Sequence, residues 1–226
     1  MNYWILVGVI ALVGWLVQSN LKSKFEKFSR EPVRLTGKEV AEKMLQDYGI
    51  TNVKVVSTAG SLTDHYNPTN MTLNLSESVY NVASVAAAAV SAHECGHAVQ
   101  HAKAYAPLRF RSALVPVVSI ASNWVQWVLL AGILLVNTFP QILLAGIGLF
   151  ALTTLFSFVT LPVEIDASKR ALKWLERSGL TSSAYQKDAE SALRAAAYTY
   201  VVAALSSLMT LLYYISIYMG GGRRRS

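Results

Sequence analysis

The sequence predicts a mainly α-helical integral membrane protein with about four hydrophobic helices and a small β-hairpin or sheet. Three observations lead to this fold class. Only 15% of the 226 residues are charged, whereas soluble domains average about 25%. Two short segments alternate apolar and polar residues, as half-buried strands do. Four stretches without a charged residue approach the roughly 20 residues that cross a bilayer; they are residues 3–17, 112–136, 139–163 and 195–219.

The first apolar stretch predicts an N-terminal transmembrane anchor within residues 1–19. Signal peptides that are removed carry a basic N-terminal region and a cleavage site of small residues. The sequence has no basic residue before the stretch, and VQSNLKSK at its end offers no such cleavage site. We therefore expect an uncleaved signal anchor. A buried helix of a soluble protein is the alternative, which the three longer stretches disfavour.

Residues 20–111 predict a polar segment with helices and two strands. Thr36 and Glu39 have the spacing of a capping box, which marks the start of a helix. Residues 52–58 and 71–76 are the two alternating segments, and a loop rich in Gly, Asn and Pro separates them. An alanine-rich stretch then predicts a long helix, near the end of which histidines cluster.

The rest of the chain predicts two membrane regions separated by a polar helix. Residues 112–163 form the expected transmembrane hairpin. Residues 164–194 form the expected polar helix, whose apolar face stops at Gly179. Residues 195–226 are expected to form a C-terminal hydrophobic helix and a basic tail.

The placement of basic residues predicts the side of the membrane on which each segment lies. The net charge is +7; residues 20–111 contain 11 Lys and Arg, residues 163–194 contain 6, and the link NTFPQ between them contains none. Because basic loops stay in the cytoplasm, both polar segments are expected there and the N-terminus outside. Four full spans would also put the terminal RRRS outside, so the side of this tail stays open.

Nucleic acid is not an expected partner, because no nucleic-acid-binding motif accompanies the basic residues. These residues are expected to orient the chain and to contact anionic lipid. Cys95 is the only cysteine, so the chain has no disulfide framework of its own.

The chemistry-bearing motif is SAHECGHAVQHA, residues 91–102, which holds three of the four histidines. On a helix, His93 and His97 lie one turn apart on one face, so both imidazoles can reach the same metal ion. Glu94 then lies beside the ion without binding it, in the position of a general base for metal-activated water. Two ordinary histidines on a helix are the alternative. We expect one zinc ion per chain at this motif.

A third protein ligand has to come from another segment. His101 lies about 12 Å along the helix from His93, too far for the same ion, and is expected to be a polar residue near the rim of the site. Catalytic zinc often takes two histidines and one glutamate. Glu164 is the best candidate, because a carboxylate so close to a membrane segment is costly unless it is paired or binds metal. A salt bridge with Lys169 or Arg170 is the alternative.

Four segments together resemble the YugP-type bacterial membrane zinc metallopeptidases and, more distantly, the HtpX-like integral membrane proteases: LTDHYNP, LNLS, SAHECGHAVQHA and LPVEIDASKRAL. The resemblance covers most of the chain and implies a cytoplasmic active site. The zinc ligands and base that it implies are His93, His97, Glu164 and Glu94. The HtpX-like pattern has an aspartate where this chain has Ser168, so the group that orients a ligand histidine stays open, with Asp166 as one candidate.

The segment DHY at residues 64–66 has two interpretations. His65 and Tyr66 can donate hydrogen bonds to a tetrahedral oxyanion and so act in catalysis. Alternatively, Asp64 caps a turn and His65 is exposed, which the residues alone favour. The resemblance includes this segment and gives the two interpretations equal weight.

These expectations combine into a membrane-embedded zinc-dependent endopeptidase, gluzincin-like, with a zincin-like H-E-x-x-H active-site helix. It is expected to hydrolyse peptide bonds of membrane-associated or unfolded proteins with zinc-activated water. Residues 72–76 are the expected edge strand, which pairs with extended substrate. The alternatives are a non-catalytic zinc-binding scaffold or adaptor and a channel; the channel is disfavoured because hydrogen bonds between helices explain Asn123 and Gln126 better.

The expected location is the inner or plasma membrane of a bacterium, which the chain crosses several times with its active site facing the cytoplasm. The expected partners are a polypeptide substrate and the lipid bilayer. An oligomer or a regulatory membrane partner stays open.

Overall fold

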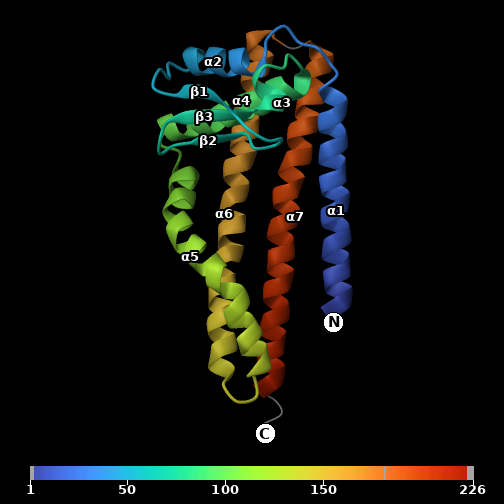
Figure 1. The fold of residues 1–226 in the computed structure, drawn as a ribbon, viewed down its shortest axis with the longest axis vertical. Coiled ribbons are helices and arrows are strands. Elements are labelled where there is room, and N and C mark those ends of the chain that lie inside the picture. The colour runs from blue at the N-terminus through green and yellow to red at the C-terminus, as the bar shows by residue number, and fades with distance from the viewer. Residues whose placement is uncertain (1–2, 181, 223–226) are drawn as a thin grey trace. The chain divides into compact units, whose positions relative to one another are not determined.

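The computed structural model describes residues 3–180 and 182–222, which are mostly helical (Figure 1). The RRRS tail, whose side of the membrane the sequence left open, lies outside the described residues. The elements are, in chain order, α1 (Tyr3–Phe28), α2 (Gly37–Asp47), β1 (Lys54–Thr58), β2 (His65–Asn67), β3 (Thr72–Ser76), α3 (Glu77–Tyr80), α4 (Val85–Ala102), α5 (Ala106–Leu134), α6 (Pro140–Ser178) and α7 (Ser183–Gly222).

Four helices among the described residues, α1, α5, α6 and α7, are long and apolar enough to cross a membrane. The four apolar stretches seen in the sequence map onto these four helices in order. The helices are longer than the stretches, because hydropathy marks where a helix leaves the hydrocarbon and not where its hydrogen bonds end. In particular, α6 continues through Pro162. This one helix contains the end of the predicted hairpin (residues 112–163) and the start of the predicted polar helix (residues 164–194).

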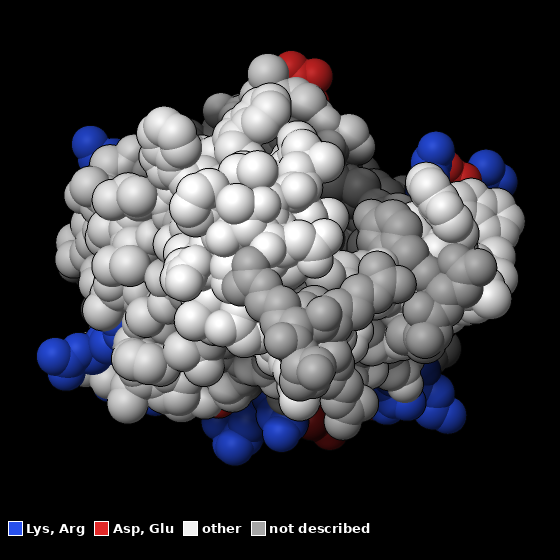
Figure 2. All heavy atoms as spheres, turned by 90° about the horizontal axis from the view of Figure 1, so that it is seen from below, with Lys and Arg blue, Asp and Glu red and all other residues white. Residues whose placement is uncertain are grey.

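The chain divides into two compact units, each with its own core. The first contains the described residues up to Gly14, Phe110–Leu161 and the described residues from Tyr200 onward; the second contains the described residues of Trp15–Arg109 and Pro162–Thr199. In the first unit, Gly132 and Gly146 let α5 and α6 approach each other closely, as small residues do between membrane helices. The described surface around the α5–α6 link is uncharged, in agreement with the link sequence NTFPQ (Figure 2).

The second unit packs α2, α3 and α4 together with the small sheet (Figure 1). The predicted capping box is confirmed at the start of α2. There the Thr36 side chain accepts a hydrogen bond from the Glu39 amide, and the Glu39 carboxylate accepts one from the Thr36 amide. Val40 and Met44 of α2 are buried and face the same core as the alanine-rich first half of α4.

The described part of the sheet has three strands in the order β1-β3-β2 and is mixed. The two predicted strands, now β1 and β3, pair in parallel and so do not form a hairpin with each other. The hairpin is formed by β2 and β3, which are antiparallel. The prediction that residues 72–76 form an edge strand is wrong, because β2 covers the second side of β3. The loop predicted between the two strands therefore contains the missing edge strand, whose three residues are too few to show a period.

The alanine-rich stretch forms the first half of α4. Ser84 caps α4, because its side chain accepts a hydrogen bond from the Ala87 amide. The residues before it form the short helix α3 instead. His93, Glu94 and His97 thus lie together in the second half of α4.

A methyl group at Gly132 should separate α5 from α6. A Cβ added there would lie 2.5 Å from the Leu143 Cα, whereas one added at Gly148 meets no described heavy atom within 4 Å. Overpacking of about 2 kcal/mol lowers the unfolding midpoint of a chain of this size by about 4–8 °C. We expect that loss for Gly132→Ala and none for Gly148→Ala in thermal unfolding of the detergent-solubilised protein. Equal midpoints would show that the two helices do not pack here.

Candidate metal centre

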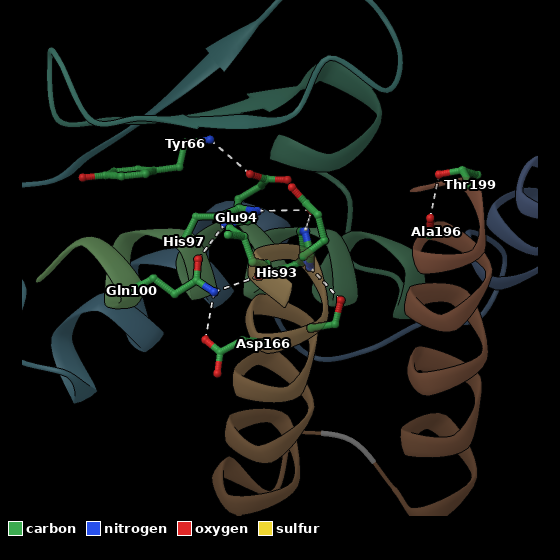
Figure 3. Close-up of polar contacts among 11 residues, drawn as sticks. Tyr66, His93, Glu94, His97, Gln100, Asp166, Ala196 and Thr199 are labelled. Carbon is green, nitrogen blue, oxygen red and sulfur yellow. Dashed lines mark hydrogen bonds and ion pairs between the residues drawn. The ribbon is translucent and has the colours of Figure 1, made fainter. Parts of the chain in front are cut away.

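Three side chains of ligand type meet between α4 and α6. The Nε2 atoms of His93 and His97 lie 3.3 Å and 3.5 Å from the same Oε2 atom of Glu164. The two imidazole rings meet edge to face, with centroids 4.9 Å apart. One ligand atom from each residue lies within 4.8 Å of the other two. The structure therefore brings together the three residues that the sequence selected as ligands; the two histidines are labelled in Figure 3.

The two nitrogen–oxygen separations in this cluster suit a zinc ion. Tetrahedral zinc with donors at about 2.0–2.2 Å keeps those donors about 3.3–3.6 Å apart, and both of the nitrogen–oxygen separations fall in that range. Two imidazole nitrogens and one carboxylate oxygen form a donor set that catalytic zinc uses, with a fourth position left open. Arg170, one of the two alternative partners expected for Glu164, pairs with Asp166 in the structure.

Gly96 allows α6 to approach the histidines. A Cβ added at Gly96 would lie 2.6 Å from the main-chain oxygen of Ala167 and 3.0 Å from its Cα. Ala167 follows Glu164 by one helical turn. The absence of a side chain at position 96, between the two histidines, thus lets the turn that carries Glu164 lie against α4.

Each histidine is also held at its other ring nitrogen. Nδ1 of His93 hydrogen-bonds to the Ser168 hydroxyl at 3.1 Å, and Nδ1 of His97 hydrogen-bonds to Oε1 of Gln100 at 3.0 Å. Such contacts orient imidazole ligands and tune their basicity. Sequence reasoning left Ser168 and Asp166 open and missed Gln100. The spacing could have identified Gln100 as a neighbour of His97, because it lies three residues later and hence on the same face of the helix.

Glu94 is buried beside the two histidines, and its carboxylate is held by β2. Oε2 of Glu94 accepts a hydrogen bond from the main-chain amide of Tyr66 at 3.0 Å (Figure 3). Because the Tyr66 amide donates to Glu94 on α4, it points away from β3, toward the edge of β2 that has no strand partner among the described residues. The free edge of β2 therefore faces the residue that the sequence predicts to be the base.

The side chains of His65 and Tyr66 have other partners among the described residues. His65 is exposed, and its Nδ1 hydrogen-bonds to the Thr63 carbonyl at 2.8 Å. The Tyr66 hydroxyl lies 2.8 Å from Nδ1 of His101, and in Figure 3 its ring extends away from His93 and His97. Burial raises the pKa of Tyr66, so its hydroxyl stays protonated at neutral pH.

Asp64 ties this segment to the sheet, because its carboxylate accepts hydrogen bonds from the amide and the hydroxyl of Ser76. His65 is exposed, as the turn interpretation expects, but it lies in β2, and Asp64 binds the end of β3 and does not cap a turn. The predicted oxyanion role of His65 and Tyr66 stays a prediction.

The local charges favour a cation between the histidines. Burial alone would lower the pKa of His97, but the hydrogen bond to Glu164 and the negative charges of Glu94 and Glu164 raise it overall. A metal ion at Nε2 would take the place of the proton that these carboxylates attract. Cys95 adds no charge, because burial and the neighbouring Glu94 raise the pKa of its thiol well above the usual value.

Comparison with known proteins places the chain in a zinc peptidase family. Residues 3–219 match the family model described as "Putative neutral zinc metallopeptidase". The chain belongs to this neutral zinc metallopeptidase family. It is also 38% identical over 217 residues to the "Putative membrane protease YugP" of Bacillus subtilis (strain 168), and the alignment covers 95% of each chain. No solved structure matches the chain.

The family assignment confirms the resemblance that the sequence motifs suggested. The described part of this neutral zinc metallopeptidase family member has four helices that are long and apolar enough to cross a membrane, which is consistent with its similarity to a membrane protease. The family also makes zinc the metal to be tested first at His93, His97 and Glu164.

Gly96→Ala should weaken zinc binding without altering a ligand, because the added methyl pushes the Glu164 turn away from α4. Displacing groups that support metal ligands typically costs about 10–100-fold in affinity, so we expect about a tenfold loss in competition with a chromogenic chelator. Cys95→Ala is the matched control in the same turn, since it adds no volume, and should keep the wild-type affinity. Equal affinities for the two variants would refute this role of Gly96.

Proposed function

We propose that the chain is a zinc-dependent endopeptidase whose active site is built on α4 and α6. The observation that carries the proposal is the convergence of His93, His97 and Glu164 with Glu94 buried next to them. In this proposal α4 is a zincin-like H-E-x-x-H helix, and the two histidines and one glutamate make the site gluzincin-like. One zinc ion per chain is expected.

Zinc held by these three side chains would supply a Lewis acid that polarises a peptide carbonyl and lowers the pKa of water. Glu94 takes the proton from the attacking water and delivers it to the nitrogen of the leaving amine. The hydrogen bond from the Tyr66 amide keeps the Glu94 carboxylate in one orientation for both steps. Ser168 and Gln100 hold the imidazole rings during the reaction.

The free edge of β2 is the place where we propose that the substrate binds, in place of the edge first expected at β3. Residues of β2 pair with β3 through alternate positions, and Tyr66 directs its amide toward Glu94 instead. An extended peptide that pairs with this edge brings its carbonyl groups next to the base. Main-chain pairing recognises extended shape more than sequence, which suits membrane-associated or unfolded polypeptides.

The segments keep the roles that the sequence suggested. We propose residues 1–19 as the anchor, 112–163 as the transmembrane hairpin and 195–226 as the C-terminal hydrophobic helix with its tail. Residues 20–111 and 164–194 then form the catalytic part on the cytoplasmic side of a bacterial inner or plasma membrane. The excess of Lys and Arg in these two segments supports the orientation.

Glu94→Gln should separate zinc binding from turnover. Glutamine can still accept the hydrogen bond from the Tyr66 amide but cannot take up a proton, so we expect a fall of about 10²–10⁴-fold in kcat with zinc content unchanged. His93→Ala and Glu164→Ala should lose zinc together with activity. Metal analysis and cleavage of casein or a membrane substrate measure the two properties, with Glu42→Gln on α2, whose side chain is exposed, as the control.

The opposite results are equally clear. Full proteolysis by Glu94→Gln would eliminate Glu94 as the base. A zinc-loaded wild-type protein that cleaves neither casein nor a membrane substrate would favour the non-catalytic scaffold or adaptor instead. Zinc content unchanged in Glu164→Ala would require another third ligand.

His65→Ala and Tyr66→Phe test the predicted oxyanion role. Loss of one oxyanion donor costs about 10²–10³-fold in kcat, and we expect that loss with little change in KM or zinc content. His101→Ala is the control, because it removes the hydrogen-bond partner of the Tyr66 hydroxyl and keeps the hydroxyl itself. Wild-type kcat in both test variants would assign the two side chains to holding the turn.

A further inference from the structure

Gln100 is a fully buried amide with defined neighbours on every polar atom. Its Nε2 donates to the main-chain carbonyl of Val163 and to Oδ2 of Asp166, both at 2.8 Å, and its Oε1 lies 3.0 Å from Nδ1 of His97 (Figure 3). The amide therefore uses both of its hydrogens and its oxygen. It joins the helix that carries the two histidines to the helix that carries Glu164.

The neighbours of the amide allow only one orientation. The Val163 carbonyl is an acceptor, and Asp166, ion-paired with Arg170, is an acceptor as well. A flipped amide would place its own oxygen against these two oxygens and leave two buried acceptors without a donor, which is costly. The Gln100 oxygen must therefore face His97.

The orientation of the amide decides which nitrogen of His97 carries hydrogen. An oxygen acceptor at 3.0 Å from Nδ1 requires hydrogen on Nδ1. In the neutral ring the lone pair is then on Nε2, the atom that lies 3.5 Å from Glu164. His93 has no such constraint, because the Ser168 hydroxyl at its Nδ1 can donate or accept.

Asp166 and Arg170 keep Gln100 in place. Nε of Arg170 donates to Oδ2 of Asp166 at 2.5 Å, and the guanidinium lies over the ring of Tyr105 at 5.6 Å from its centroid. The Tyr105 amide in turn donates to the main-chain carbonyl of Gln100 at 2.9 Å. The contacts form a closed ring of four residues that starts and ends at Gln100.

We propose that Gln100 is a positioning residue that fixes His97 as the Nδ1–H tautomer and so presents Nε2 for metal binding. Asp166 and Arg170 act through Gln100 and do not contact the metal. The proposal rests on the proposed zinc site but not on peptidase activity. It assigns to Asp166 a function that its place in the sequence left open.

Gln100→Leu tests the proposal, because leucine keeps the volume and removes the amide. We expect about a 10–100-fold loss of zinc affinity, measured by chelator competition on the full chain in detergent. Gln186→Leu is the matched control: its Nε2 also donates to a main-chain carbonyl of α6, that of Leu172, at 2.9 Å. This control should keep wild-type zinc affinity, because Gln186 touches neither histidine in its described contacts.

A second readout does not depend on metal. In the metal-free protein labelled with ¹⁵N-histidine, the shifts of His97 should show hydrogen on Nδ1, and Gln100→Leu should show a mixture of tautomers. Asp166→Ala should lower zinc affinity in the wild-type background and add no further loss to Gln100→Leu, because it acts through the amide.

Three outcomes would overturn the proposal: wild-type zinc affinity in Gln100→Leu, a neutral His97 ring with hydrogen on Nε2 and none on Nδ1 in the wild-type protein, or additive losses for Gln100→Leu and Asp166→Ala. Absence of proteolysis alone would count against the proposed function and would leave these measurements unaffected. Absence of zinc binding by the wild type, together with Nδ1–H at His97, would count against the metal centre and against a metal-binding role for Gln100.

Discussion

The buried carboxylate of Glu164 between two imidazoles is the interaction on which the rest of the structure depends. A carboxylate removed from water costs several kcal/mol unless close partners compensate it. Two close partners here are the Nε2 atoms of His93 and His97, at 3.3 Å and 3.5 Å. Both histidines lie on α4 and Glu164 lies on α6, so the compensation requires the two helices to touch. The missing side chain at Gly96 makes that contact possible.

The polar end of α6 is organised in two rows around this contact. Glu164 and Ser168, one turn apart, serve the histidines directly, whereas Asp166 and Arg170, also one turn apart, serve Gln100. Residues four apart share a helix face, so each row faces one set of partners. One helix thus provides a direct contact for each imidazole and, through Gln100, a second tie to His97.

Local spacing explains which parts of the site could be predicted from sequence. The separation of His93 and His97 is set by one helical turn. Glu164 could be selected because a carboxylate beside a membrane stretch is costly unless it is paired or binds metal. Gln100 carries no motif, and its importance arises from Val163 and Asp166, which are distant in sequence. The metal-binding roles of His93, His97 and Glu164 and the catalytic role of Glu94 remain predictions.

The fold shows the same division between local and distant information. The apolar stretches and the capping box at Thr36 are local and were found, whereas the strand order is a property of the whole sheet. The sequence therefore suggested an edge at β3, although the edge next to α4 is β2. Helix ends were also displaced, since α6 continues past Pro162 although the charged residues that begin at Glu164 end the apolar stretch.

The contact between β2 and Glu94 has a consequence for how this region can be studied. The donor is a peptide N–H, which every amino acid except proline supplies. An alanine scan through β2 would leave that hydrogen bond intact and would report only on the side chains. The contribution of the strand to the carboxylate becomes visible only when the backbone itself is altered, by an imino acid or an ester linkage at position 66.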